Sequence, residues 1–162
     1  MKKNLLTIIL IFQIGLLSAQ KTQSELIIGT WRFEKKCDLR TETEKSEFVV
    51  ISCGPETENG TEYADRTFKK NNDFEFYYNL NEISCGKYNI ENHKLTLENR
   101  LSENQIENNK ERVESYLKKK LIIKKQDGFY YYRPVILELK SIIKNRLELG
   151  TEKHYTIWTR IK

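Results

Sequence analysis

The residue types that usually carry out chemistry are scarce in this sequence. It contains two histidines, His93 and His154, and three cysteines. Neither histidine has an acid or a cysteine at a spacing typical of a metal or catalytic site. The sequence also lacks a glycine-rich phosphate loop, a Gly-X-Ser-X-Gly motif and a His-Glu-X-X-His motif. We therefore predict a protein that is not an enzyme and that has no cofactor and no metal site.

Residues 1–19 have the three-part pattern of a signal peptide. Lys2 and Lys3 form a short basic segment, residues 5–17 are mostly apolar, and small residues lie at Ser18 and Ala19. As a helix the apolar segment would extend about 20 Å, which is too short for a bilayer core of about 30 Å. We therefore expect an exported protein, periplasmic or secreted, whose mature chain has no stable membrane span and folds as one domain over residues 20–162.

Export permits a disulfide bond, and the three cysteines allow one. If residues 31–37 and 46–53 form a hairpin, Cys37 and Cys53 lie about 24 Å apart at opposite ends of it. A disulfide requires Cα atoms within about 7 Å. In an up-and-down meander the strand that ends at Cys53 and the strand that begins near Cys85 share a rim. The Cys53–Cys85 pair is therefore the preferred disulfide, and it would leave Cys37 unpaired.

The charge balance gives no indication of a nucleic-acid partner. The chain has 28 basic and 23 acidic residues, a net charge of +5, and the leader contributes two of the lysines. A nucleic-acid-binding domain normally has a clustered basic face. The densest basic run, Lys118–Lys120 with Lys124 and Lys125, surrounds three apolar residues. We interpret it as an exposed strand or rim, in preference to an anion or lipid-headgroup site.

A two-residue period runs through the first half of the mature chain. Gly29, Trp31 and Phe33 share one face of a predicted strand, and alternation or a strand-rich composition then recurs in the segments 46–53, 61–69, 73–78, 86–90 and 95–97. Short strands at this spacing predict an all-β antiparallel fold with about eight to ten strands. A closed up-and-down barrel and a β-sandwich both fit this count.

The second half of the chain is less regular. Residues 100–112 are polar and fit a loop or one or two helical turns, and residues 113–125 are predicted to be extended. Gln126-Asp127-Gly128 predicts a hairpin turn, followed by strands on either side of Pro134. The segment 138–149 fits either two strands joined by a turn or an amphipathic helix, and we favour the strands.

Short motifs near the two ends of the mature chain, and three segments between them, resemble those of a known family. Gly29-Thr30-Trp31 begins the first strand, and Arg160 lies in the last. The pairing is similar to the Gly-X-Trp motif and the terminal-strand arginine of the lipocalins and the wider calycin group. The segments 67–75, 86–90 and 94–97 also resemble small exported lipocalin-like domains of bacteria. The resemblance implies a barrel of about eight strands in which Gly29, Trp31 and Arg160 close one end and do not contact ligand. Trp158 shares a strand face with Arg160 and is an alternative partner for it.

Two functions fit such a barrel. An eight-stranded barrel is wide enough to be filled by its own side chains or to hold one small ligand. The first hypothesis is a non-enzymatic binding protein for a small apolar ligand. Its ligand-lining candidates are the aromatic residues expected to point inward, namely Phe33, Phe74, Phe76, Tyr78, Tyr88 and Tyr131. The alternative is a protein-interaction module, such as an inhibitor or immunity factor, with a filled barrel and with exposed tyrosines and lysines that bind the partner.

The signal peptide yields the first prediction. Protein purified from its host should begin at Gln20 or Lys21, because the small residues at Ser18 and Ala19 suit a signal peptidase. N-terminal sequencing measures the start directly. Retention of Met1, with the protein in the membrane pellet, would refute the export hypothesis.

Overall fold

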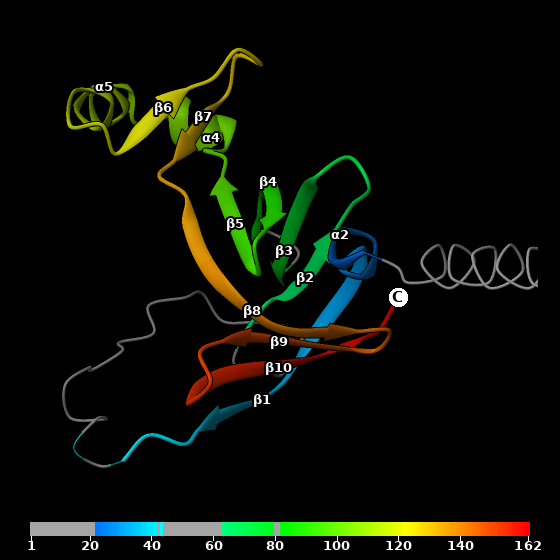
Figure 1. The fold of residues 1–162 in the computed structure, drawn as a ribbon. Helices are drawn as coiled ribbons and strands as arrows, with labels where there is room; N and C mark the ends of the chain where they lie inside the picture. The colour runs from blue at the N-terminus through cyan, green and yellow to red at the C-terminus, as the bar shows by residue number, and fades with distance from the viewer. Residues whose placement is uncertain (1–21, 42, 44–62, 80–81) are drawn as a thin grey trace, which may run out of the picture.

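The computed structural model describes residues 22–41, 43, 63–79 and 82–162, and Figure 1 shows their arrangement. Most of the described chain forms antiparallel strands. The strands are β1 (Gly29–Asp38), β2 (Asp65–Phe68), β3 (Asp73–Asn79), β4 (Glu82–Glu91), β5 (Lys94–Asn99), β6 (Ile122–Lys124), β7 (Tyr130–Tyr132), β8 (Val135–Ile143), β9 (Arg146–Gly150) and β10 (His154–Arg160). The helices are α2 (Gln23–Leu26), α4 (Glu103–Glu107) and α5 (Lys110–Lys118).

Eight of these strands close into a barrel in the order β1-β10-β9-β8-β5-β4-β3-β2. Every pairing is antiparallel, and the barrel closes where β1 pairs with both β2 and β10. Closure leaves no strand edge open in the barrel wall, so the wall cannot pair edge to edge with another sheet. The predicted all-β up-and-down barrel of about eight strands is therefore confirmed.

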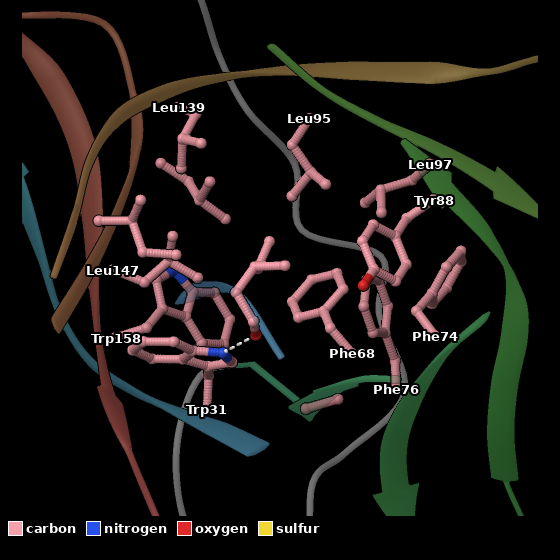
Figure 2. Close-up of a cluster of buried hydrophobic side chains, with 14 residues drawn as sticks. Trp31, Phe68, Phe74, Phe76, Tyr88, Leu95, Leu97, Leu139, Leu147 and Trp158 are labelled. Carbon is pink, nitrogen blue, oxygen red and sulfur yellow. Dashed lines mark hydrogen bonds between the residues drawn. The ribbon is translucent and has the colours of Figure 1, made fainter. Parts of the chain in front are cut away.

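Alternation along each strand sends apolar side chains inward and polar side chains outward. In β3 the buried residues are Phe74 and Phe76, and β5 buries Leu95 and Leu97 in the same way. The inward residues form one cluster that includes Trp31, Phe68, Phe74, Phe76, Tyr88, Leu95, Leu97, Leu139, Leu147 and Trp158 (Figure 2). Figure 2 shows the two tryptophans on one side of this cluster and the phenylalanines on the other.

The segment between β5 and β8 lies outside the barrel wall. Figure 1 shows α4, α5 and the β6–β7 hairpin gathered beyond the end of β5. They have a small core of their own, in which Leu101, Val113 and Ile122 are buried and Tyr116 and Leu117 pack against them. The insertion therefore extends one end of the barrel without contributing a strand to it.

The prediction that residues 113–125 are extended is wrong for the first part of that segment. Lys110–Lys118 forms helix α5. Val113, Tyr116 and Leu117 are three and four residues apart, so one helical face brings all of them against the small core. The strand expected there is limited to Ile122–Lys124. The helical spacing was present in the sequence, but three apolar residues in a charged segment are a weak signal.

Three other expectations about local structure are confirmed. The segment 138–149 forms strand, turn and strand, because Ile142 pairs with Leu147 across the β8–β9 turn. The turn at 126–128 joins β6 to β7, in which Lys124 pairs with Tyr130. Gln23–Leu26 forms one helical turn, with Thr22 and Glu25 in a capping box. The strand expected at 46–53 lies outside the described residues.

Within the described part of the chain, no helix is long and apolar enough to cross a membrane.

Packing at Gly86 yields a prediction about stability. Gly86 lies on the inner face of β4, opposite Phe74, and an added Cβ would meet the Glu98 carbonyl oxygen and the Phe74 ring. Because the Glu98 backbone cannot move without disturbing the β4–β5 pairing, Gly86→Ala should lower the free energy of unfolding by roughly 1–3 kcal/mol. Urea unfolding measures this change.

The matched control is Asn89→Ala. Asn89 is exposed on the same strand, so its substitution should change the free energy of unfolding by less than about 0.5 kcal/mol. Equal losses for the two variants would mean that close packing at Gly86 does not contribute to the barrel.

Candidate ligand site

One end of the barrel is sealed by Arg160 and Trp31. The guanidinium carbon of Arg160 lies 4.2 Å from the centroid of the Trp31 ring. The guanidinium also donates hydrogen bonds to the backbone carbonyls of Leu26 and Ile28, and to that of Lys144 at 2.6 Å. The indole Nε1 of Trp31 donates to the Ile27 carbonyl at 2.7 Å. Two residues thus bind the segment before β1, the last strand and the β8–β9 turn to one another.

Helix α2 covers the same end. Its Gln23 amide is hydrogen-bonded to the Nδ1 of His93, in the β4–β5 turn, at 2.9 Å. Gly29 lies directly beneath Arg160, where an added Cβ would meet the guanidinium, and its φ of +138° is a conformation that suits glycine. The structure therefore brings Gly29, Trp31 and Arg160 together at one closed end.

Trp158 has a different arginine over its ring. The guanidinium carbon of Arg66 lies 4.0 Å from the Trp158 ring centroid and 4.9 Å from that of Phe76. Arg66 is on β2, where it pairs with Trp31 of β1 and Phe76 of β3, and both of these side chains are buried. Because paired residues in an antiparallel sheet share a face, Arg66 points into the barrel.

Partly exposed aromatic side chains lie beside Trp158. Phe33 lies 4.7 Å from Tyr63 and 5.6 Å from Trp158, measured between ring centroids. Tyr63 is 5.8 Å from Trp158. Phe33, Tyr63 and Tyr78 pack against the main core but keep part of their surface accessible. We call this part of the barrel, defined by Phe33, Tyr63, Arg66, Tyr78 and Trp158, the open half.

Arg66 has an unusual environment for a charged side chain. Burial lowers the pKa of Arg66 to about 10, and the nearby Tyr78 and Tyr63 oppose that shift. The guanidinium therefore remains charged at neutral pH. Arg66 nevertheless keeps part of its surface accessible to solvent.

A cavity lies at the mouth of the open half. It measures about 540 Å³ and is lined by strand residues that include Tyr78, Ser84 and Asn99, and by Gln105 and Tyr132 of the insertion. Ser84 donates a hydrogen bond to Asn99 at 3.1 Å across this rim. Tyr78 belongs to both regions. It lines the cavity, and its charge interaction with Arg66 raises the pKa of that arginine.

The predicted ligand-lining residues are divided among three environments. Phe33 and Tyr78 lie in the open half. Phe74, Phe76 and Tyr88 are buried in the packed core, and the Tyr88 hydroxyl donates to the Lys69 carbonyl at 2.8 Å. The sequence analysis did not identify Arg66 or Tyr63. Arg66 shares its parity with Phe68, so alternation along β2 was the available signal for an inward arginine.

Tyr131 lies outside the barrel wall, on the β6–β7 hairpin. It is buried, and its hydroxyl donates to the Asp127 carboxylate at 2.7 Å. Burial, together with this carboxylate, raises the pKa of Tyr131 to about 12, and the same hydrogen bond lowers the pKa of Asp127. Tyr131 borders a second cleft of about 340 Å³, between the hairpin and the outer face of β3 and β4.

The cysteines and histidines form no common site in the described residues. Cys37 and Cys85 carry no disulfide, and Cys53 of the predicted Cys53–Cys85 pair lies outside the described residues. His93 is bound to α2, as above. Burial is the main cause of the lowered pKa of His154, and Arg40 and Lys36 add to it. No group of three or more potential metal ligands occurs among the residues that the structure describes.

The closed eight-stranded antiparallel barrel, with Trp31 and Arg160 covering one end, is the architecture that the resemblance to the lipocalins predicts. No protein-family model matches the chain, and no curated protein sequence matches it. Among solved structures it is similar to a lipocalin-like protein from Bacteroides uniformis, with 11% identity and a TM-score of 0.44 over 84% of this chain and 99% of that one. It is also similar to an uncharacterized protein from Bacteroides eggerthii, with 14% identity and a TM-score of 0.44 over 83% and 98% of the two chains.

The contacts of Arg160 yield a prediction about coupling. Trp31→Ala should lower the free energy of unfolding by about 3–5 kcal/mol, because it removes a fully buried aromatic side chain. Arg160→Ala should lower it by about 1–3 kcal/mol, because buried carbonyl groups lose their donors. The double variant should lose less than the sum, with a coupling of roughly 0.5–3 kcal/mol, since the two side chains touch.

Denaturant unfolding of the four proteins in the cycle measures the coupling. Arg146, whose guanidinium pairs with Glu148 on the outer surface, supplies the control cycle with Trp31. That control should be additive within about 0.3–0.5 kcal/mol. Additivity of the Trp31 and Arg160 losses would contradict the seal described above.

Proposed function

We propose that this protein is an exported, non-enzymatic binding protein that holds one small apolar ligand in the open half of its barrel. Residues 1–19 would direct export to the periplasm or the exterior and would be removed. The ligand would enter at the mouth, between Tyr78 and the insertion, and its apolar surface would lie against Phe33, Tyr63 and Tyr78.

The asymmetry of the barrel is the observation that supports this proposal. At the sealed end Trp31 has no exposed surface. Elsewhere in the barrel Phe33, Tyr63 and Tyr78 keep accessible surface, and Tyr78 also lines a cavity of about 540 Å³. Ligand sites in proteins are concave, mostly apolar and lined by aromatic side chains with a few polar groups.

The interaction-module alternative is less well supported, because it needs an exposed aromatic surface. Tyr131 is buried against the barrel rim, and its neighbours Tyr130 and Tyr132 pack against the small core of the insertion. The tyrosine run at 130–132 therefore does not form such a surface.

Titration with a neutral apolar fluorophore, N-phenyl-1-naphthylamine, tests the proposal. One molecule should bind per chain, with the fluorescence increase that follows transfer out of water. Phe33→Ala should weaken binding by about tenfold, because it removes apolar contact area worth about 1–2 kcal/mol.

Ile136→Ala is the matched control. Ile136 is exposed on the outer face of β8, so this variant should bind the fluorophore as the parent protein does. Absence of binding, or equal binding by Phe33→Ala and the parent protein, would refute a ligand site in the open half. If the fluorophore binds as expected, native mass spectrometry of protein purified from its host would identify the natural ligand.

A further inference from the structure

The lysine-rich run that begins at the end of α5 lies in the insertion, which Figure 1 shows beyond the end of β5. Residues 115–126 contain five lysines and no acidic residue. Lys125 is paired with Glu98 of β5. Lys118–Lys120 and Lys124 are exposed, and they form no ion pair with a carboxylate of the described chain. The run therefore presents four positive charges that the described part of the protein does not neutralise.

Two apolar side chains within this run are uncovered. Alternation along β6 turns Ile122 into the small core of the insertion and turns Leu121 and Ile123 to the opposite face. Leu121 is 38% exposed and Ile123 is 47% exposed. On the same face Tyr131, which pairs with Ile123, is buried, so the exposed apolar surface lies on the β6 side of the hairpin.

Exposed aliphatic side chains between unpaired lysines match the surface of an anionic bilayer. At such a surface apolar side chains enter the boundary between headgroups and acyl chains, and lysines bind the anionic headgroups. Lysine suits this position because its apolar stem can lie along the lipid while its ammonium group reaches the phosphates. Each lysine close to an anionic surface strengthens binding by roughly fivefold.

The shape of this surface favours a membrane over an acidic polypeptide. Residues 118–124 line none of the cavities at the barrel mouth, at the outer face of β3 and β4, or within the insertion. A polypeptide is normally held in a groove or added to the edge of a sheet. Strand β6 is only three residues long and offers little edge for such an addition. A lipid surface needs neither feature.

We infer that residues 118–124 form a peripheral docking surface for an anionic phospholipid bilayer. Leu121 and Ile123 enter the headgroup boundary, and Lys118–Lys120 and Lys124 bind the lipid phosphates. The sequence alone favours an exposed strand over a lipid-headgroup site, and the exposure of the two apolar side chains reverses that preference. This inference goes beyond the function proposed above and holds whether or not the barrel contains a ligand.

Co-sedimentation with lipid vesicles tests the inference. The protein used begins at Gln20, because the apolar leader would itself bind lipid. The vesicles contain phosphatidylcholine alone, or phosphatidylcholine with about one third phosphatidylglycerol, and we expect at least about tenfold tighter binding to the anionic mixture. Binding should weaken as sodium chloride is raised from about 50 to about 500 mM, because salt screens exposed charges. This comparison does not depend on any variant being folded.

Variants of matched charge locate the contact. Replacement of Lys118, Lys119 and Lys120 by glutamine should weaken binding to the anionic vesicles at least about tenfold. The control replaces three exposed lysines of the barrel, Lys35, Lys94 and Lys144, by glutamine. It removes the same charge and should weaken binding by less than about threefold, since these lysines lie outside the insertion.

A second pair of variants tests the apolar contact. Leu121→Ser combined with Ile123→Ser should weaken binding about fivefold or more, because apolar area no longer enters the lipid. Ile143→Ser combined with Ile161→Ser is the control, since both isoleucines are exposed and lie outside the insertion. This control should bind as the parent protein does.

Four results would overturn the inference. Equal binding to both kinds of vesicle would exclude recognition of anionic lipid. Equal losses in the two lysine variants would mean that net charge alone attracts the protein. Unchanged binding by the variant at Leu121 and Ile123 would exclude an apolar contact. Binding to poly-L-glutamate without binding to vesicles would assign the surface to an acidic polypeptide.

Discussion

The guanidinium of Arg160 is the contact on which closure of this barrel depends. It comes from the last strand, lies over the Trp31 ring of the first strand, and donates to carbonyls on both the segment after α2 and the β8–β9 turn. Arg160 and the segment that precedes β1 are more than a hundred residues apart in the chain, so their contact requires the whole barrel to be in register. Because β1 pairs with β10 and β2 alike, loss of this contact affects both sides of the seam.

This seal divides the barrel into two halves with different physical roles. Trp31 and Leu147 near Arg160 are fully buried and contribute stability, since a buried aromatic or leucine side chain is worth about 1.5–3 kcal/mol. At the opposite end the strands are joined by the insertion and by connections that include residues outside the described ranges. Phe33, Tyr63 and Tyr78 remain partly accessible there. A barrel with one rigid, filled end can tolerate incomplete packing at the other, which is where a ligand can replace missing contacts.

Much of this fold followed from alternation in the sequence, and much of the site did not. Four strands were predictable because one face of each is buried and the other is exposed to solvent; they are those at 29–34, 73–78, 86–90 and 94–97. Helix α5 was missed, since Val113, Tyr116 and Leu117 give a period of 3.6 only over one short segment. Tyr131 was expected inside the barrel, because periodicity assigns a face to a residue but does not identify the sheet to which its strand belongs. Closure itself depended on the long-range pairing of Trp31 with Arg160, which only the resemblance suggested.

Arg66 was missed because an arginine is normally expected on the solvent-exposed face of a strand. In an open sheet that expectation is usually correct. In a closed barrel the face on which Arg66 lies is fixed by the pairing of β2 with both of its neighbouring strands. β2 is bonded on both sides, so a one-residue change of register would send Arg66 outward only by sending Phe68 out of the core with it. Phe68 is almost completely buried and in contact with Phe76 and Tyr88. The packing of Phe68 therefore keeps Arg66 inside the barrel, where the rings of Trp158 and Phe76 stabilise its charge.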